Sequence, residues 1–170
     1  MSPTGPRPRL LVMGPAGVGK TTVGTALAAA LQVPFLDADD LHSAANRMRM
    51  RSGQPLDDAA RAPWLDAVHE RLRAAPHGLV VACSALRQRY RDRLGQQLPD
   101  LRYIHLRADR ALLAARLAAR TGHFFPLSLL DDQLQCLEPP RGAIELDASR
   151  PVAELVATAV AKLLGPPPPG

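Results

Sequence analysis

A segment close to the N-terminus has the residue types of a phosphate-binding loop. It reads Gly14-Pro15-Ala16-Gly17-Val18-Gly19-Lys20-Thr21 and matches G-x-x-x-x-G-K-[ST] at every fixed position. Glycines let backbone N–H groups converge on phosphate oxygens, and a helix that follows directs its positive end at them. Lys20 can reach the β- and γ-phosphates, and the Thr21 hydroxyl can ligate Mg²⁺. We therefore expect this loop, together with Thr22, to bind a nucleoside triphosphate.

Two carboxylates follow the next short apolar segment, Phe35-Leu36. Asp37 and Asp39 are separated by one residue, and we expect their side chains to point in opposite directions from an extended segment. We assign Asp37 to Mg²⁺ or its waters, and Asp39 to the hydroxyl of a phosphoryl acceptor as the candidate base. The alternative is an aspartate-rich loop that caps the next helix, a role that Asp40 could fill.

Two arginines four residues apart form the third candidate group. Arg116 and Arg120 would share one face of a helix expected over 109–120. A lid that carries arginines onto the triphosphate stabilises the charge on the transferring group. We place this lid at about 121–128, with Gly122 as a hinge and His123 as part of it. The alternative is an exposed basic helix end that favours the helix dipole.

Alternating strand and helix patterns must position these groups. We expect strands at 10–13, 35–36, 79–83, 103–106 and 144–146, and helices at 21–31, 41–52, 63–75, 86–95, 109–120, 128–137 and from 151 onward. Pro63 and Pro151 would open the helices that they begin. The alternation predicts an α/β protein with three α/β/α layers and a mostly parallel five-stranded sheet, whose ligands bind beyond the carboxyl ends of the strands. We expect the strand at 35–36 to lie beside the strand at 10–13.

Length and composition bound the remaining choices. The 170 residues fit a single domain, which we place at 9–164 between flexible tails at 1–8 and 165–170 that are rich in proline and glycine. The net charge of +5 comes from arginine, whose planar cation suits phosphates and carboxylates. No basic run is interleaved with aromatic residues, so we expect no nucleic-acid partner.

Cysteine usage and hydropathy indicate the compartment. Cys83 and Cys136 have no C-x-x-C partner, which argues against a zinc site or a disulfide framework and suits a reducing compartment. No apolar stretch approaches the roughly 20 residues of a membrane span, and no signal-peptide segment precedes the first strand. We expect a cytoplasmic protein without a membrane partner.

Several blocks in order resemble the gluconokinase family across about residues 10–161. They are Asp37-Ala38-Asp39-Asp40-Leu41-His42, Asn46, Arg49-Met50, Gly53-Gln54-Pro55-Leu56, Arg61-Ala62-Pro63-Trp64-Leu65, Cys83-Ser84-Ala85-Leu86-Arg87, Tyr90-Arg91-Asp92 and Gly122-His123-Phe124-Phe125. The resemblance implies a P-loop kinase fold like that of shikimate and nucleoside monophosphate kinases. It also implies transfer from ATP, with Mg²⁺, to D-gluconate to give 6-phospho-D-gluconate, and a homodimer.

Gluconate is a polyol with a carboxylate, so it needs a cation at the acid end and hydrogen-bond partners for its hydroxyls. Candidate carboxylate ligands are Arg49, Arg61 and Arg87; candidate hydroxyl partners are His42, Asn46, Ser84 and, in the lid, His123. Each arginine could instead form a surface salt bridge, and His42 could cap or pack. The single tryptophan, Trp64, could be core, a wall of the pocket or a direct contact.

The chain departs from the family pattern at a few positions. Ala38, Ser43 and Arg49 stand where the family usually has Gly, Pro and Lys, Ala60 replaces the second acid before Arg61, and Leu134 replaces Phe. None of these changes removes the P-loop, Asp39 or the two lid arginines. We expect an active kinase whose catalytic residues are Lys20, Asp39 and Arg120. The alternatives are another small-molecule kinase of this fold, of shikimate or nucleotide type, and a non-catalytic ATP-binding module.

Overall fold

A parallel five-stranded sheet forms the centre of the molecule. The computed structural model describes residues 7–120, 122 and 125–165. The strands are β1 (Arg9–Met13), β2 (Phe35–Asp37), β3 (Leu79–Ala82), β4 (Leu101–Arg107) and β5 (Ile144–Asp147). They run in the order β2-β3-β1-β4-β5, and each neighbouring pair is parallel. The fold class predicted from the alternating pattern is confirmed.

The position of β2 differs from our expectation. β3 lies between β1 and β2, with Val81 paired to Leu11 on one side and to Leu36 on the other. The difference has a physical reason, because all four residues of β3 are buried whereas the three residues of β2 are only half-buried. An apolar strand gains most from a central place, and a short strand suits the edge.

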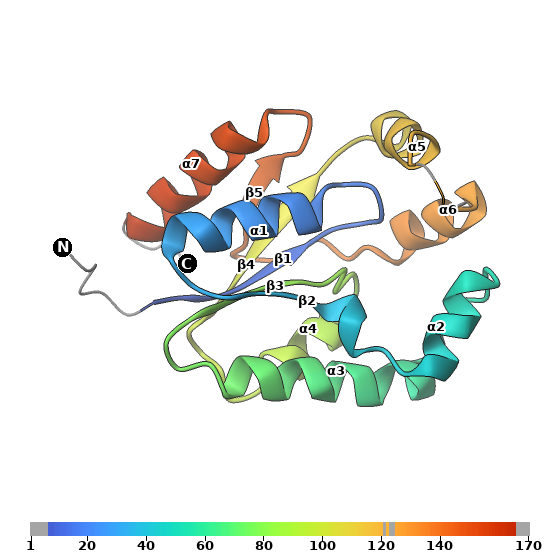
Figure 1. Ribbon diagram of the computed structural model, residues 1–170, viewed down its shortest axis with the longest axis horizontal. Coiled ribbons are helices and arrows are strands. Elements are labelled where there is room, and N and C mark those ends of the chain that lie inside the picture. The colour runs from blue at the N-terminus through green and yellow to red at the C-terminus, as the bar shows by residue number, and fades with distance from the viewer. Residues whose placement is uncertain (1–6, 121, 123–124, 166–170) are drawn as a thin grey trace.

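Helices cover both faces of the sheet (Figure 1). They are α1 (Lys20–Leu31), a 3₁₀ turn η1 (Ala38–Leu41), α2 (Ala44–Arg51), α3 (Asp58–Arg73), α4 (Gln88–Leu94), α5 (Arg110–Ala118), α6 (Leu127–Cys136) and α7 (Val152–Leu164). Strand β1 shows how the layers are joined. Leu10 and Val12 pack with α1 and α7, whereas Leu11 and Met13 pack with α3 and α4.

Two helix boundaries differ from the predicted ones because capping residues were overlooked. Helix α3 begins at Asp58 rather than Pro63, since the Asp57 carboxylate caps it by accepting the Ala60 N–H at 2.7 Å. Pro63 therefore lies inside the helix. The segment predicted as one helix over 41–52 contains the end of η1 and then α2, which Ser43 caps.

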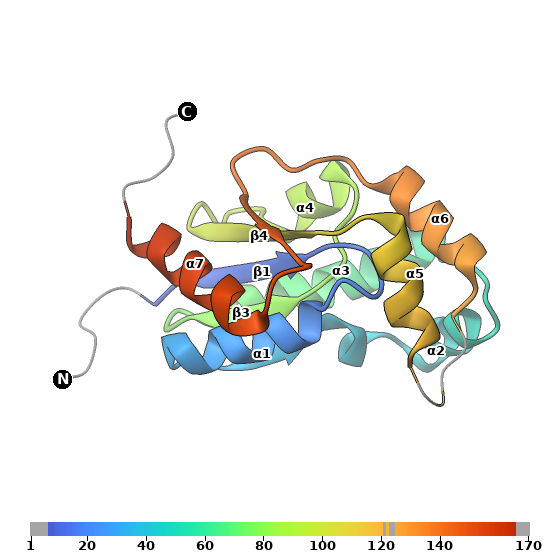
Figure 2. The same cartoon turned by 90° about the horizontal axis from the view of Figure 1, so that it is seen from above.

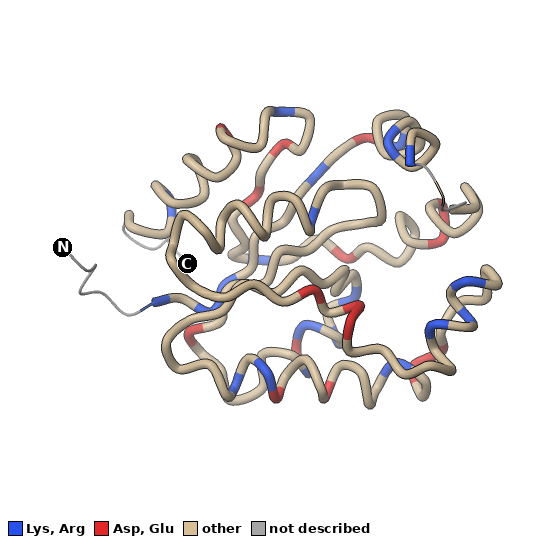
Figure 3. Tube along the Cα trace, in the orientation of Figure 1, with Lys and Arg blue, Asp and Glu red and all other residues tan. Residues whose placement is uncertain are grey.

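The helices α2, α5 and α6 gather at the carboxyl end of the sheet (Figure 2). Acidic residues gather where β2 runs into η1, and basic residues lie along α2 (Figure 3). This end of the sheet is where ligands bind in parallel α/β folds. At the N-terminal side, Pro8, which we assigned to the tail, accepts a hydrogen bond from the Leu79 N–H at 3.2 Å. Among the helices of the described ranges, none is long and apolar enough to cross a membrane.

Candidate active site

The P-loop joins β1 to α1 in a conformation that only glycine adopts easily. Gly17 has φ 83°, and a Cβ there would lie 3.0 Å from the Leu117 side chain. Gly19 has φ 102° and forms the N-cap of α1, with open space where a Cβ would stand. Positive φ angles cost little at glycine. The loop therefore wraps the start of α1, as predicted from the motif, and Thr22 lies exposed in the first helical turn.

Lys20 is the first residue of α1, and its side chain folds back over the loop. The ammonium Nζ donates to the Pro15 carbonyl at 3.0 Å. Burial lowers the pKa of Lys20, the negative charge of Asp39 raises it, and the positive charge of Arg120 lowers it. Asp39 and Arg120, the other two predicted catalytic groups, are therefore both close enough to Lys20 to affect its charge.

The two predicted metal ligands are in direct contact. The Thr21 hydroxyl donates to Asp37 Oδ2 at 2.9 Å, across 16 residues of sequence. The second carboxylate oxygen, Oδ1, accepts the Asp39 N–H at 3.0 Å and so caps η1. Hydroxyl and carboxylate oxygens beside a phosphate loop are the ligands that Mg²⁺ prefers. The donor set fits this metal.

The extended geometry that we used to separate Asp39 from Asp37 is wrong, because Asp39 lies in the 3₁₀ turn. In an extended segment, two residues at this spacing would in addition share one face. The separation comes instead from the turn, in which Asp37 is held by Thr21 and by the Asp39 backbone. The Asp39 side chain is 76% exposed. Desolvation by the surrounding residues nevertheless raises the pKa of Asp39, and the negative charge of Asp37 raises it further. The exposure limits the size of this shift.

His42 and Asn46 form a buried polar cluster next to Asp39. The His42 ring stacks on Trp64 at 4.1 Å between centroids and 13° between planes. Burial, followed by the positive charges of Arg61 and Arg47, lowers the pKa of His42 to about 4. The neutral ring accepts at Nδ1 from the Asn46 amide, 3.4 Å away, so the proton sits on Nε2, 3.9 Å from Asp39 Oδ1.

Trp64 is a buried wall residue of this cluster. It is 5% exposed, and its indole N–H donates to the Ala38 carbonyl at 2.6 Å. That bond ties α3 to η1, the turn that contains Asp39. Of the roles that the sequence left open for Trp64, the structure supports core and pocket wall.

Arg61 projects from α3 into a network that contains Tyr90. Its Nη1 donates to the Tyr90 hydroxyl at 2.5 Å, and its guanidinium lies 4.7 Å from the centre of the same ring. The Tyr90 hydroxyl donates to Asp58 at 2.8 Å, and Arg89 pairs with Asp58 at 2.7 Å. From the sequence, Tyr90 was recognised only as part of a family motif. The spacing of its neighbours along the helix does not indicate that it contacts Arg61 and Asp58.

The other acceptor-side candidates are less closely grouped. Ser84 follows β3, and its carbonyl accepts the Gly14 N–H at 3.4 Å, which places it beside the P-loop. Arg87 donates to Cys136 Sγ at 3.2 Å and lies 3.8 Å from a Glu138 oxygen. Arg49 is exposed on α2. For Arg87 the structure thus shows bonds to α6 and to the segment that follows it.

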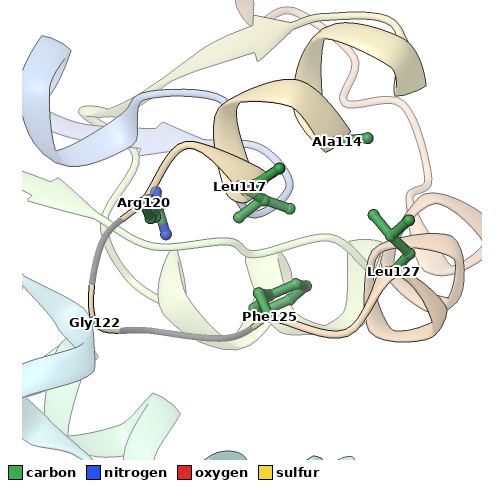
Figure 4. A pocket seen from close by; sticks show the side chains of 7 residues that line it. Ala114, Leu117, Arg120, Gly122, Phe125 and Leu127 are labelled. Atoms are coloured by element: carbon green, nitrogen blue, oxygen red, sulfur yellow. The ribbon is translucent and has the colours of Figure 1, made fainter.

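The lid arginines do not share a helix face, because α5 ends at Ala118 and Arg120 follows it. Arg116 donates to the carbonyls of Val18 at 3.2 Å and Ala148 at 2.7 Å, so it ties α5 to the P-loop backbone. Arg120 lines a cavity of about 490 Å³ between α5 and α6 (Figure 4). The remaining lining residues are Ala114, Leu117, Ala118, Gly122, Phe125 and Leu127. His123 lies outside the described residues.

Known proteins resemble this chain in sequence and in fold. A family model described as an AAA domain matches residues 10–140. A gluconokinase of Gluconobacter oxydans is 50% identical over 141 residues, which cover 80% of this chain and 79% of that protein. The thermosensitive gluconokinase of Escherichia coli is 36% identical over 156 residues, covering 85% and 81%. The chain belongs to the gluconokinase family.

Solved structures agree with this assignment to the gluconokinase family. A gluconokinase from Sinorhizobium meliloti superposes with a TM-score of 0.84 at 44% identity, covering 91% of this chain and 90% of that one. A shikimate kinase from Bacteroides thetaiotaomicron gives a TM-score of 0.68 at 19% identity, covering 91% and 97%. The second likeness concerns the fold alone, which is that of the P-loop kinases.

Three positions that depart from the gluconokinase pattern take part in contacts beside Asp39. Ala38 is fully buried, and its carbonyl holds Trp64. Ser43 caps α2 through the Asn46 N–H at 3.1 Å, and the Ala60 carbonyl accepts from the Asn46 side chain at 2.9 Å. These contacts support the turn beside Asp39, and those at Ala38 and Ala60 use main-chain carbonyls that any residue supplies. The substitutions therefore leave this turn in place.

Proposed function

We propose that this chain transfers the γ-phosphoryl group of ATP to D-gluconate and releases ADP and 6-phospho-D-gluconate. The observation that carries the proposal is the acidic turn of Asp39 at the P-loop edge, within electrostatic reach of Lys20, in a member of the gluconokinase family. A kinase needs this pairing of a phosphate cradle with an acceptor-binding acid.

The donor side follows from the loop geometry. Backbone N–H groups from Gly17 to Thr22 would surround the phosphates at the positive end of α1. Thr21 and Asp37 would hold Mg²⁺, which neutralises charge on the β- and γ-phosphate oxygens. Lys20 would leave the Pro15 carbonyl, its partner in this structure, to bind the terminal phosphates.

The acceptor side depends on Asp39. A gluconate hydroxyl oxygen forms a bond to the γ-phosphorus, the bond from that phosphorus to the bridging oxygen of ADP breaks, and the hydroxyl proton passes to the Asp39 carboxylate. A raised pKa makes Asp39 a stronger base than an ordinary aspartate. The Nε2–H of His42 faces the same carboxylate and would orient it.

The remaining candidates would bind the ends of the substrates. Arg61 is the best placed to bind the gluconate carboxylate, because it is half-buried and already oriented by Tyr90. Arg120 would stabilise charge on the transferring group. We retain Arg49 and Arg87 as further carboxylate ligands, a lid at about 121–128 and a homodimer as parts of the proposal.

A coupled assay of ADP release tests the acceptor. We expect turnover with D-gluconate and none above background with shikimate or AMP, each supplied with MgATP. Turnover of shikimate or AMP without turnover of gluconate would refute the proposal in favour of another kinase of this fold.

Substitution of the acid tests catalysis itself. Asp39→Asn should lower kcat by about 10²-fold or more while MgATP still binds, because only the base is lost. Asp40→Asn is the matched control, since Asp40 is the exposed neighbour in the same turn. Equal activity of the two variants would exclude Asp39 as the base, and a wild-type protein that binds ATP without turnover would indicate a non-catalytic module.

A further inference from the structure

One peptide group of the P-loop is held at both ends by side chains. The Pro15 carbonyl accepts from Lys20 Nζ at 3.0 Å and from the Val18 N–H at 3.3 Å. At the other end of the same peptide plane, the Ala16 N–H donates to Gln133 Oε1 at 2.7 Å. The chain of bonds therefore runs from Gln133 through the Pro15–Ala16 peptide to the lysine ammonium.

Gln133 reaches this peptide from far along the sequence. It lies 117 residues from Ala16, on α6, and is half-buried. Hydrogen bonds in such a chain polarise and strengthen one another, and an N–H that loses its partner away from water is costly. The amide oxygen of Gln133 therefore stabilises one orientation of the peptide plane over the flipped one.

The next two loop residues, Gly17 and Val18, contact a different helix. Leu117 packs directly against Gly17, and Arg116 donates to the Val18 carbonyl at 3.2 Å. Both of these residues belong to α5. Gly17 and Val18 thus contact α5, whereas Ala16 contacts α6 through Gln133.

We propose that Gln133 is a positioning residue for phosphoryl transfer, which acts by fixing the orientation of the Pro15–Ala16 peptide within the phosphate loop. If the amide oxygen is lost, the peptide plane can rotate about its flanking dihedrals, and the loop can leave its phosphate-binding conformation. The loop then has to be reordered when the triphosphate binds. The inference rests on the proposed function for its kinetic consequence, but its consequence for nucleotide binding stands by itself.

The test compares Gln133→Met with Gln135→Met. Methionine keeps the length of the side chain and removes the acceptor. Gln135 is the matched control, because it lies exposed two residues further along the same helix. For each variant we would measure the dissociation constant of MgATP by calorimetry, kcat, the KM of both substrates and Tm.

We expect Gln133→Met to weaken MgATP binding by about fivefold, as the loss of one hydrogen bond predicts, with the gluconate KM within about twofold of wild type. Gln135→Met should match wild type in every quantity. MgATP binding by Gln133→Met within twofold of wild type would overturn the inference. The inference would also be overturned if Gln133→Met raised the KM of both substrates equally and lowered Tm, because that result indicates a structural role only.

Two further outcomes are kept separate. If wild-type protein does not phosphorylate gluconate, the proposed function fails, while the calorimetric comparison still decides the role of Gln133. If Gln133→Met is not recovered folded, Gln133→Asn replaces it, because the shorter amide stays polar but no longer reaches the Ala16 N–H. The same threshold of about twofold in MgATP affinity then applies.

Discussion

Replacing Tyr90 by phenylalanine removes one hydroxyl group and leaves the ring that supports Arg61. The hydroxyl accepts from Arg61 Nη1 at 2.5 Å, and the ring stays 4.7 Å from the guanidinium carbon. Arg61 therefore keeps its stacking contact and loses its orientation. The two tyrosines of the chain, Tyr90 and Tyr103, make a matched pair for this experiment.

The magnitude follows from the burial of the arginine. A hydrogen bond to a charged group is worth about 1.5–3 kcal/mol, and the 24% exposure of the Arg61 side chain reduces this to roughly 1 kcal/mol. An Arg61 side chain that is free to move costs about 0.5–1.5 kcal/mol to order again when gluconate binds, which raises the gluconate KM by about fivefold. For a chain of 170 residues, a loss of about 1 kcal/mol lowers Tm by roughly 2–4 °C.

The assay is coupled ADP release with gluconate and ATP varied separately. We expect Tyr90→Phe to raise the gluconate KM about fivefold while the ATP KM stays within about twofold of wild type. Tyr103→Phe loses the bond from its hydroxyl to the Arg91 carbonyl at 3.0 Å, so Tm should fall without a change in either KM. The reasoning is refuted if Tyr90→Phe leaves the gluconate KM unchanged, or if it raises the gluconate KM and the ATP KM alike.

Further predictions concern the metal, the buried histidine and the thiols. Thr21→Ala and Asp37→Asn should each raise the Mg²⁺ concentration for half-maximal rate by about tenfold, and an unchanged Mg²⁺ titration would exclude both as ligands. His42 has a pKa of about 4 when folded, against 6.5 when unfolded, so the unfolded chain binds the proton first as pH falls. The contribution of neutral His42 to the free energy of unfolding is fully present above pH 6.5 and declines toward pH 4. Between pH 7 and pH 5, the free energy of unfolding should fall by about 2 kcal/mol more in the wild-type protein than in His42→Gln. An NMR titration of His42 with a midpoint near pH 6.5 would contradict this. Burial raises the pKa of Cys83 to about 12, so at pH 8 one thiol of the native protein, Cys136, should react with Ellman's reagent, and rapid reaction of both would show that Cys83 is accessible.

The parts of the site that could be predicted are those encoded by neighbouring residues. The P-loop is contiguous, and its glycines, lysine and threonine specify backbone angles and ligands within one turn of chain. The buried strands were readable because a parallel strand covered on both faces must be continuously apolar, as Leu10 to Met13 are. Asp37 could be assigned to the metal because it ends a strand at the ligand-binding edge.

Errors arose where one local signal competed with another. Pro63 is a common first residue of a helix, but the Asp57 cap lies further upstream and begins α3 earlier. Arg116 and Arg120 have the spacing of one helix face, but the last turn of α5 tightens, with the Arg120 N–H bonded to the Leu117 carbonyl at 3.3 Å. Periodicity alone does not decide where a helix ends.

The amino-acid sequence by itself determined the fold class, the phosphate loop and the kind of chemistry, because these depend on hydrophobic periodicity and on residues adjacent in the chain. Only the tertiary structure decided that β3 separates β1 from β2, that burial makes His42 a weak base, and that Gln133 bonds the P-loop. These features join residues that are distant along the chain. They follow from how the crossovers pack against the sheet, a non-local result that no single stretch of sequence contains.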